Sequence, residues 1–439
     1  MFLQSSYEHV MSGVHRMTGR WLGHPNDLWR ITAADFTVRT AYQMGKTPLL
    51  PIYAAMLGAS DLFIGYVVSI STATGLLLKP LFGLLSDRTG RKVWLLAGLC
   101  LFSTLPFLYR FVNTPQDLLA LRLFHGTATA IFGPVGLAYV AEMGAERRAE
   151  RLGVFGMARS GGYLLAPTIA AVLLTYFPPE QVFTIIGFAS CLAFVPLSGL
   201  SRRPAMRRTA FLPGLTTALS AVQASRAFWF AAALETVLHA ATYAIKAFLP
   251  VYALTVAGFD VLLVGLFFSV QELTHLLMRP LGGRLADRFG PDSVIAAGLF
   301  ILGCALLAIG EAQSIAAWLA VAVGIGVSLG AILPSTLSLL ASEMPADHLG
   351  AGMGVLGSLR NLGKILGPVA AGITLTRTDY EGLFTLCALF VFVTAMAVCV
   401  FVSRRWGPGR QTAVHRNGVL RWSASGGENE RDTRAPKPR

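Results

Sequence analysis

The chain has 439 residues, of which 54% are hydrophobic and only 13% charged, and its mean hydropathy is +0.59. Soluble domains carry about 25% charged residues, so this composition excludes an ordinary soluble protein and indicates a polytopic membrane protein. The formal net charge of +13 could suggest a nucleic-acid partner. The bases concentrate in loops between apolar segments, however, and this placement favours a membrane surface over nucleic acid.

Apolar stretches long enough to span a bilayer follow one another along the chain. A spanning helix needs roughly 20 mostly apolar residues. Breaking the chain at polar, glycine and proline positions predicts spans at 31–57, 62–86, 93–112, 116–142, 152–176, 180–200, 227–255, 259–286, 293–311, 315–343, 352–376 and 381–403. We therefore predict an all-α membrane protein with twelve transmembrane helices in two pseudo-symmetric six-helix bundles.

The predicted organisation has five parts. They are a cytoplasmic N-terminal segment (1–30), an N-terminal six-helix bundle (31–200), a cytoplasmic basic linker (201–226), a C-terminal six-helix bundle (227–403) and a disordered basic cytoplasmic tail (404–439).

The loops at the two ends of the predicted bundle differ in charge. One set is basic and contains Arg88, Arg91, Lys92, Arg147, Arg148, Arg151, Arg202, Arg203, Arg207, Arg208 and Arg288. The alternate set is acidic and contains Asp61, Asp117, Glu180, Asp260, Glu311, Asp379 and Glu381. We call these the basic-loop end and the acidic-loop end. Cytoplasmic loops carry an excess of Lys and Arg, so the basic-loop end and both termini are predicted to be cytoplasmic, in an inner or plasma membrane.

The two halves of the sequence repeat each other. Residues 79–92 read KPLFGLLSDRTGRK, and residues 279–292 read RPLGGRLADRFGPD. Residues 153–167 (GVFGMARSGGYLLAP) return as residues 354–368 (GVLGSLRNLGKILGP). The offset stays within one residue of 200, so six spans have been duplicated in the same order. A parallel repeat of six spans is an organisation found in secondary transporters.

These motifs resemble those of the major facilitator superfamily, over roughly residues 30–403. GLLSDRTGRK matches the family's G-x-L-x-D-R-x-G-R-K loop between helices 2 and 3. RLFHGTATA resembles the fourth-helix R-x-x-Q-G motif, with His125 in place of glutamine. Residues 354–372 fit the glycine pattern of the drug:proton antiporter-like branch, with Ala371 replacing one glycine. The fifth helix, where that branch carries its signature, has Ala166, Ala170 and Ala171 instead of glycines, which departs from the antiporter pattern.

The resemblance implies that the repeated loop latches the two halves together in one access state. Gly83 is expected to allow close approach of the second helix to a neighbour, and Asp87 to cap a helix or pair with Arg91. The second copy has Pro291 and Asp292 in place of two bases, so the latch should be stronger in the first half. The alternative is a basic turn that only sets topology. The candidate latch residues are Gly83, Asp87, Arg88, Gly90, Arg91, Gly283, Asp287 and Arg288.

Ionisable residues inside the predicted spans form repeated polar stripes. Asp35, Arg39, Tyr42 and Lys46 advance by four, three and four residues, which keeps them on one helix face, and a matching stripe follows 200 residues later. Charges inside a membrane are expensive and are functional candidates by default. The candidate substrate and proton cavity contains Asp35, Arg39, Tyr42, Lys46, Arg122, His125, Glu235, His239, Tyr243, Lys246, Glu272, His275, Arg360 and Lys364, with Arg159 and Arg279 nearby.

Three roles for these charges remain open from the sequence. An acid or a histidine could carry a coupling proton, surplus bases could bind an anionic substrate, or the charges could only hold helices in register. The simplest local pairs are Asp35 with Arg39, and Glu272 with His275 or Arg279. Asp35, Lys46 and Lys246 could instead extend to a membrane face.

The predicted function is proton-coupled secondary active transport of a small organic solute, anionic or amphipathic, by alternating access, with export somewhat favoured. Uncoupled facilitation, import of an organic anion, and a non-transporting sensor on the same scaffold are the alternatives. No Walker-type GxxxxGK[ST] segment and no catalytic or metal-binding constellation occurs in the sequence, so we expect no enzyme activity, cofactor or metal. The expected partners are the solute, protons and the lipid bilayer, and the expected state is a monomer.

Overall fold

The computed structural model describes residues 26–144, 147–202, 225–343 and 346–405, and these ranges contain helices and no strand. The predicted N-terminal segment, basic linker and C-terminal tail lie almost wholly outside the described residues. The helices are α2 (Asp27–Lys46), α3 (Leu49–Met56), α4 (Asp61–Thr89), α5 (Arg91–Leu108), η1 (Tyr109–Phe111), α6 (Pro115–Ala141), α7 (Arg148–Tyr176), α8 (Pro179–Cys191), α9 (Phe194–Ser198), α11 (Arg226–Thr255), α12 (Val261–Phe289), α13 (Pro291–Glu311), α14 (Ile315–Glu343), α15 (Ala346–Leu375) and α16 (Tyr380–Arg405).

The described helices form the predicted twelve membrane crossings. Ten of the described helices are long and apolar enough to span a membrane. The two other crossings are α2 with α3, and α15, and both contain charged residues. The predicted all-α, twelve-helix architecture is therefore confirmed.

Prolines divide the first and sixth crossings, which the sequence predicted as continuous spans at 31–57 and 180–200. Thr47 adopts an extended conformation at the end of α2, because the residue before a proline is pushed out of the helical region, and α3 begins after Pro48. Pro196 lacks the N–H that would bond back four residues, and the chain turns between α8 and α9.

Local sequence sets the helix ends at the loops. Thr114 and Asp117 form a capping box at the start of α6, in which each side chain accepts a hydrogen bond from the other's backbone N–H. Gly90 (φ 98°) and Gly290 (φ 85°) stand at equivalent turns between α4 and α5 and between α12 and α13. At these φ and ψ values a residue with a Cβ is strained, so the repeated glycine favours both turns.

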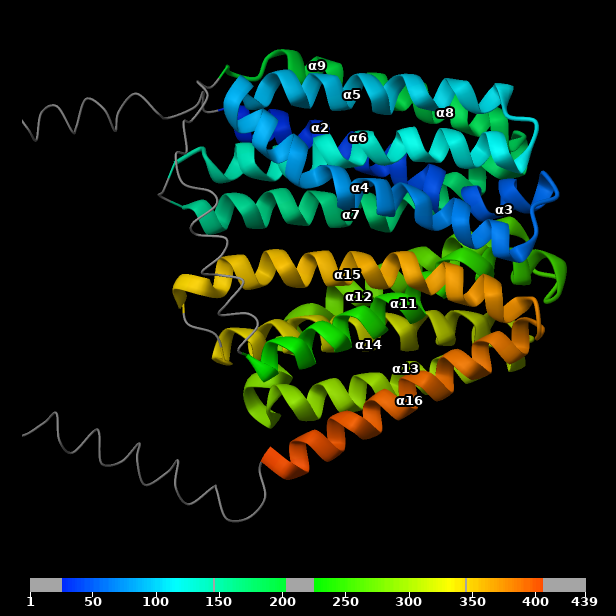
Figure 1. Ribbon diagram of the computed structural model, residues 1–439. Coiled ribbons are helices and arrows are strands. Elements are labelled where there is room, and N and C mark those ends of the chain that lie inside the picture. The colour runs from blue at the N-terminus through cyan, green and yellow to red at the C-terminus, as the bar shows by residue number, and fades with distance from the viewer. Residues whose placement is uncertain (1–25, 145–146, 203–224, 344–345, 406–439) are drawn as a thin grey trace, which may run out of the picture.

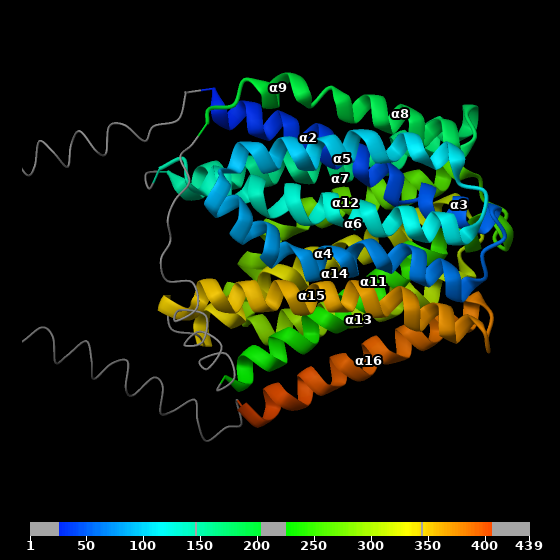
Figure 2. The ribbon, with the colours of Figure 1, turned by 45° about the horizontal axis from the view of Figure 1, so that its top comes forward.

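The N-terminal and C-terminal helices gather into two halves. Figure 1 shows α2–α9 together and α11–α16 below them. In Figures 1 and 2, α2 begins and α16 ends at one end of the bundle, which is the basic-loop end, while α3 lies at the opposite, acidic-loop end. Contacts between the halves are made mainly by α4 with α15 and by α7 with α12.

The halves are tightly packed at the acidic-loop end. Ser69 of α4 donates a hydrogen bond of 2.8 Å to the carbonyl oxygen of Ile365, and Tyr380 donates one of 2.9 Å to Asp61. An apolar cluster that includes Tyr53 and Phe248 joins both halves there. Close approach of this kind needs small residues at the contact.

The glycines toward the basic-loop end make no such contact. A Cβ added at Gly83, Gly153, Gly283 or Gly354 would meet nothing within 4 Å. The expectation that Gly83 brings α4 against a neighbouring helix is therefore wrong for this conformation, because the halves meet at the other end of the molecule. The structure is closed at the acidic-loop end.

Replacing Gly367 by alanine is expected to lower the temperature of thermal unfolding, because the new Cβ would lie 2.1 Å from the carbonyl oxygen of Ala240 on α11. Overpacking of this kind costs about 1–3 kcal/mol. Gly354→Ala on the same helix is the matched control, since it has open space and alanine favours helices. The measurement is thermal unfolding of the purified protein in detergent. Equal losses in both variants would contradict the packing explanation.

Candidate functional site

The first buried ion pair joins α2 to α7. Arg159 donates two hydrogen bonds to Asp35, with Nε to Oδ2 at 2.9 Å and Nη2 to Oδ1 at 2.8 Å. The predicted local partner, Arg39, is also present, with its Nε 3.6 Å from Asp35 Oδ1. Asp35 is 1% exposed, so its charge is neutralised inside the protein by two guanidinium groups.

The second buried ion pair repeats the first in the other half. Arg360 of α15 contacts Glu235 of α11 through two hydrogen bonds of 3.1 and 3.2 Å, and Glu235 is fully buried. His239 Nδ1 lies 3.3 Å from the same carboxylate. Glu235 and Arg360 follow Asp35 and Arg159 by 200 and 201 residues. Neither pair between helices was predicted from the sequence, although both partners of each pair recur in the repeat.

The third carboxylate, Glu272 of α12, contacts two basic side chains. Its Oε1 lies 3.0 Å from Lys246 Nζ, and its Oε2 lies 3.3 Å from His275 Nδ1. The local pairing with His275 is as predicted. The alternative partner, Arg279, instead donates to His275 Nε2 at 3.2 Å and reaches Ser160 of the other half at 3.5 Å.

Buried polar groups of the N-terminal half surround Arg122. Its Nη2 donates to Ser71 Oγ at 2.6 Å, and its guanidinium lies 5.8 Å from the centre of the Tyr42 ring. Its Nε has no hydrogen-bond partner, although Arg122 is only 1% exposed. His125 Nδ1 lies 3.2 Å from the Tyr109 hydroxyl. Within the described residues, Arg122 has no carboxylate at ion-pair distance.

Three lysines gather around one aromatic ring between the halves. The ammonium groups of Lys46, Lys246 and Lys364 lie 5.0, 5.6 and 5.3 Å from the centre of the Tyr243 ring. We call these three lysines and Tyr243 the lysine cluster. Lys46 comes from α2 in the first half, and the other members come from α11 and α15 in the second. In the described part of the chain, neither Lys46 nor Lys364 has a carboxylate within ion-pair distance.

The structure brings the predicted cavity residues into one buried zone. All fourteen are buried or half-buried, and Lys46 is only 9% exposed, so it does not extend to a membrane face. Lys79 of α4 was missed; it is half-buried and close enough to Arg39 and Tyr42 to interact electrostatically with them. Its position inside the apolar second span (62–86) was the sequence signal that could have identified Lys79. No cluster of metal-ligating side chains occurs among the described residues.

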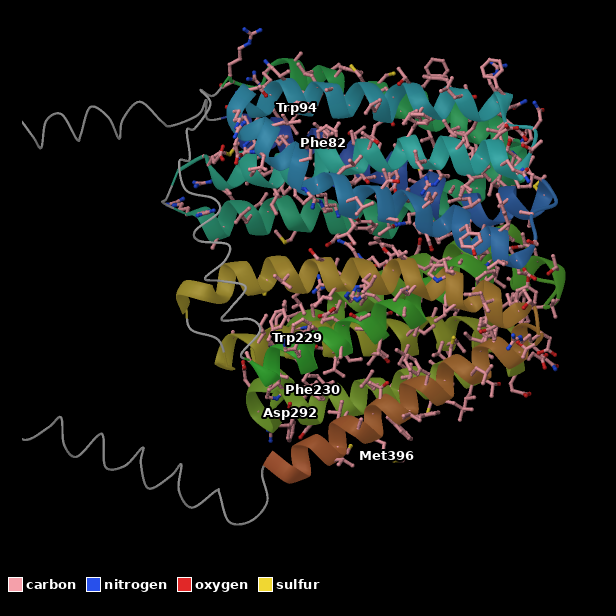
Figure 3. All side chains as sticks on the ribbon, viewed as in Figure 1. Phe82, Trp94, Trp229, Phe230, Asp292 and Met396 are labelled. Carbon is pink, nitrogen blue, oxygen red and sulfur yellow. The ribbon has the colours of Figure 1, made fainter. Side chains whose placement is uncertain are left out.

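The candidate latch forms a network within the first half. Arg91 pairs with Asp87 and, at 2.7 Å, with Glu142 at the end of α6. Phe82 and Trp94 pack beside this turn (Figure 3), and their ring centres are 5.2 Å apart. In the described ranges no ion pair of Asp287 or Arg288 occurs, and Arg288 lies over the Phe289 ring. In this conformation the network therefore holds α4, α5 and α6 together, and its role as a latch between the halves stays a prediction.

Comparison with known proteins identifies the family. The sequence profile of the Major Facilitator Superfamily matches residues 36–274 and 258–425. The chain belongs to the major facilitator superfamily. NarK2 of Mycobacterium tuberculosis, a probable nitrate/nitrite transporter, is 27% identical over 368 residues, which cover 81% of this chain and 90% of that protein. The multidrug resistance protein MdtG of Klebsiella pneumoniae is 23% identical over 403 residues, covering 89% and 94%.

The fold is shared with solved transporters of the superfamily. The crystal structure of a mutant of the nucleoside transporter NupG superposes with a TM-score of 0.74 at 15% identity and covers 85% of this chain and 99% of that one. By the match to the superfamily's profile, the chain is a multi-pass membrane transporter of this superfamily, whose members as a class are not enzymes.

Replacing Asp35 by asparagine is expected to destabilise the protein, because Arg39 and Arg159 would lose their common counter-ion inside the bundle. Breaking a buried pair in this way costs about 3–5 kcal/mol. The control is Glu150→Gln, whose pair with Arg147 spans 3.9 Å and is mostly exposed, so its loss should lie within measurement error. Thermal unfolding in detergent compares the two. An Asp35→Asn protein as stable as the control would show that the pair does not support the fold.

Proposed function

We propose that the protein is a proton-coupled secondary active transporter of a small anion, working by alternating access. The observation that carries the proposal is the distribution of charge in the buried zone. Each of its three carboxylates, Asp35, Glu235 and Glu272, is already paired with bases. Arg122, Lys46 and Lys364 remain without a carboxylate partner within the described residues. Buried charges require a partner, and a bound anion supplies one.

The contact between Glu272 and Lys246 supplies a route to proton coupling. Lys246 Nζ lies 3.0 Å from Glu272, so this lysine is neutralised by protein in the structure. A proton on Glu272 removes that negative charge and releases Lys246 for an anion. Proton binding and anion binding then support each other through one shared lysine, which gives transport of both in the same direction.

The closed acidic-loop end fits one state of the transport cycle. Superfamily transporters move two halves about a central site, so that the site opens to each side in turn. With the basic loops facing the cytoplasm, the described conformation is the one that is closed to the outside. The bacterial relatives support an inner-membrane location, and we propose that the protein acts there as a monomer.

Export of amphipathic compounds is the second candidate, favoured by the similarity to MdtG. The glycine pattern of residues 354–372 supports an export function less strongly than it did in the sequence, because packing accounts for two of its glycines. A Cβ at Gly363 would lie 2.2 Å from the Thr236 carbonyl oxygen, and Gly367 makes a similar contact, so both glycines are explained by packing of α15 on α11. A non-transporting sensor has no specific structural observation in its favour.

Uptake into sealed vesicles containing the purified protein tests the proposal. The panel consists of small inorganic and organic anions, cationic amphipathic dyes and neutral sugars, each with and without an imposed pH gradient. We expect uptake of anions, increased when protons flow inward. Transport of neutral sugars alone would refute the anion assignment, and transport of the dyes alone would favour the second candidate.

Glu272→Gln is expected to separate transport from the proton gradient. Glutamine cannot ionise, so Lys246 stays available without a proton, and anion exchange should persist while accumulation against a gradient is lost. Labelled-anion uptake, read together with a pH-sensitive dye inside the vesicles, measures both. Glu311→Gln at the acidic-loop end is the matched control, because Glu311 is exposed there. Gradient-driven accumulation by the Glu272→Gln protein would rule out this coupling route.

A further inference from the structure

We infer that the lysine cluster around Tyr243 binds a substrate bearing two negative charges, and that it discriminates against anions bearing one. This inference rests on the proposed function, since it names the class of anion that the transporter carries. The ligand class is a small dianion, either an organic dicarboxylate or a divalent oxyanion.

The geometry of the cluster places three cations around a single point. Each ammonium nitrogen lies within 6 Å of the centre of the Tyr243 ring, so no two of them are farther apart than twice that distance. Two of these lysines, Lys46 and Lys246, occupy equivalent positions in the sequence repeat, 200 residues apart. Lys364 approaches the same ring from α15. The site is therefore built from both halves, and a ligand in it touches both.

The charges in the cluster do not balance without a ligand. Among the described residues, Glu272 is the one carboxylate at ion-pair distance from a member of the cluster: it contacts Lys246, and its other oxygen contacts His275, which lies outside the cluster. Three ammonium groups against one carboxylate leave two positive charges uncompensated, on Lys46 and Lys364. The attraction of the aromatic ring for each cation supplies only about 0.5–2 kcal/mol and does not neutralise charge. A dianion matches this excess while Glu272 is ionised, and protonation of Glu272 adds Lys246 as a third cation that the same dianion can contact. A monoanion leaves at least one ammonium group without a counter-ion in either state.

The surroundings of Lys46 indicate a ligand independently of this balance of charges. Its side chain is 9% exposed and donates no hydrogen bond in the described residues, where its close polar neighbours are the rings of Tyr42 and Tyr243. Lysine has three ammonium N–H groups, and buried donors are normally satisfied. Lys46 therefore has ammonium N–H groups for which no acceptor occurs among the described protein groups, and a bound anion can accept them.

Matched ligands test the charge requirement directly. Succinate and succinamate have similar size and shape, but succinate carries two carboxylates and succinamate one. We measure their binding to the full-length protein in detergent by titration calorimetry at constant pH and ionic strength. Succinate should bind at least about tenfold more tightly, because its second carboxylate interacts with an ammonium group that succinamate leaves unpaired. Sulfate is included as a competitor: displacement of succinate assigns the site to divalent oxyanions as well, and failure to displace assigns it to dicarboxylates.

Single substitutions locate the binding site. Lys46→Gln and Lys364→Gln should each weaken succinate binding at least about tenfold and reduce the preference over succinamate. Lys46→Arg and Lys364→Arg retain the charge and should keep that preference, which separates loss of charge from loss of folding. Arg110→Gln removes an exposed charge at the acidic-loop end and should change neither affinity.

Two results overturn the inference in different ways. Equal affinity for succinate and succinamate, or equal loss of binding in the glutamine and arginine variants, refutes the dianion assignment while leaving anion transport standing. If no anion binds and the vesicles transport only neutral sugars, the inference and the proposed function both fail.

Discussion

Neutralisation of charge inside the membrane is the constraint on which this structure depends. A carboxylate in the bundle interior is tolerated only when bases from neighbouring helices reach it. Asp35 meets this condition through α7, Glu235 through α15, and Glu272 through α11. Each of these contacts fixes the relative position of two helices. The bases that remain after these pairings form the zone in which we propose that an anion binds.

The contacts at the acidic-loop end differ in kind from those near the middle of the molecule. At the acidic-loop end, backbone and small side chains approach closely across the halves, as at Ser69 and Ile365. Near the middle the interactions are ionic and involve long side chains such as Lys46 and Lys364, which can move without unpacking a helix. Close packing is lost when the halves separate, whereas long ionic side chains can follow a bound solute. This division suits the proposed alternating access, in which the two ends of the molecule open in turn around a central site.

Much of this arrangement could be predicted from the sequence. Apolar length and the repeat of about 200 residues predicted the helices, and the spacing of Asp35, Arg39 and Lys46 predicted a polar face that is indeed buried. The partners on other helices could not be predicted, because helical periodicity describes one helix at a time. Arg159 reaches Asp35 only because α7 packs on α2. The break at Pro48 was missed for a different reason: apolar length alone does not distinguish one helix from two short ones.

The contacts that close the acidic-loop end are themselves duplicated. Gly65 of α4 lies against Pro368 of α15, and Gly265 of α12 lies against Pro167 of α7, its counterpart in the repeat. Each half therefore presents one glycine surface and one proline surface to the other half. A six-helix unit that carries both faces is complementary to an identical copy of itself, so two such units joined in one chain need a linker but no new interface.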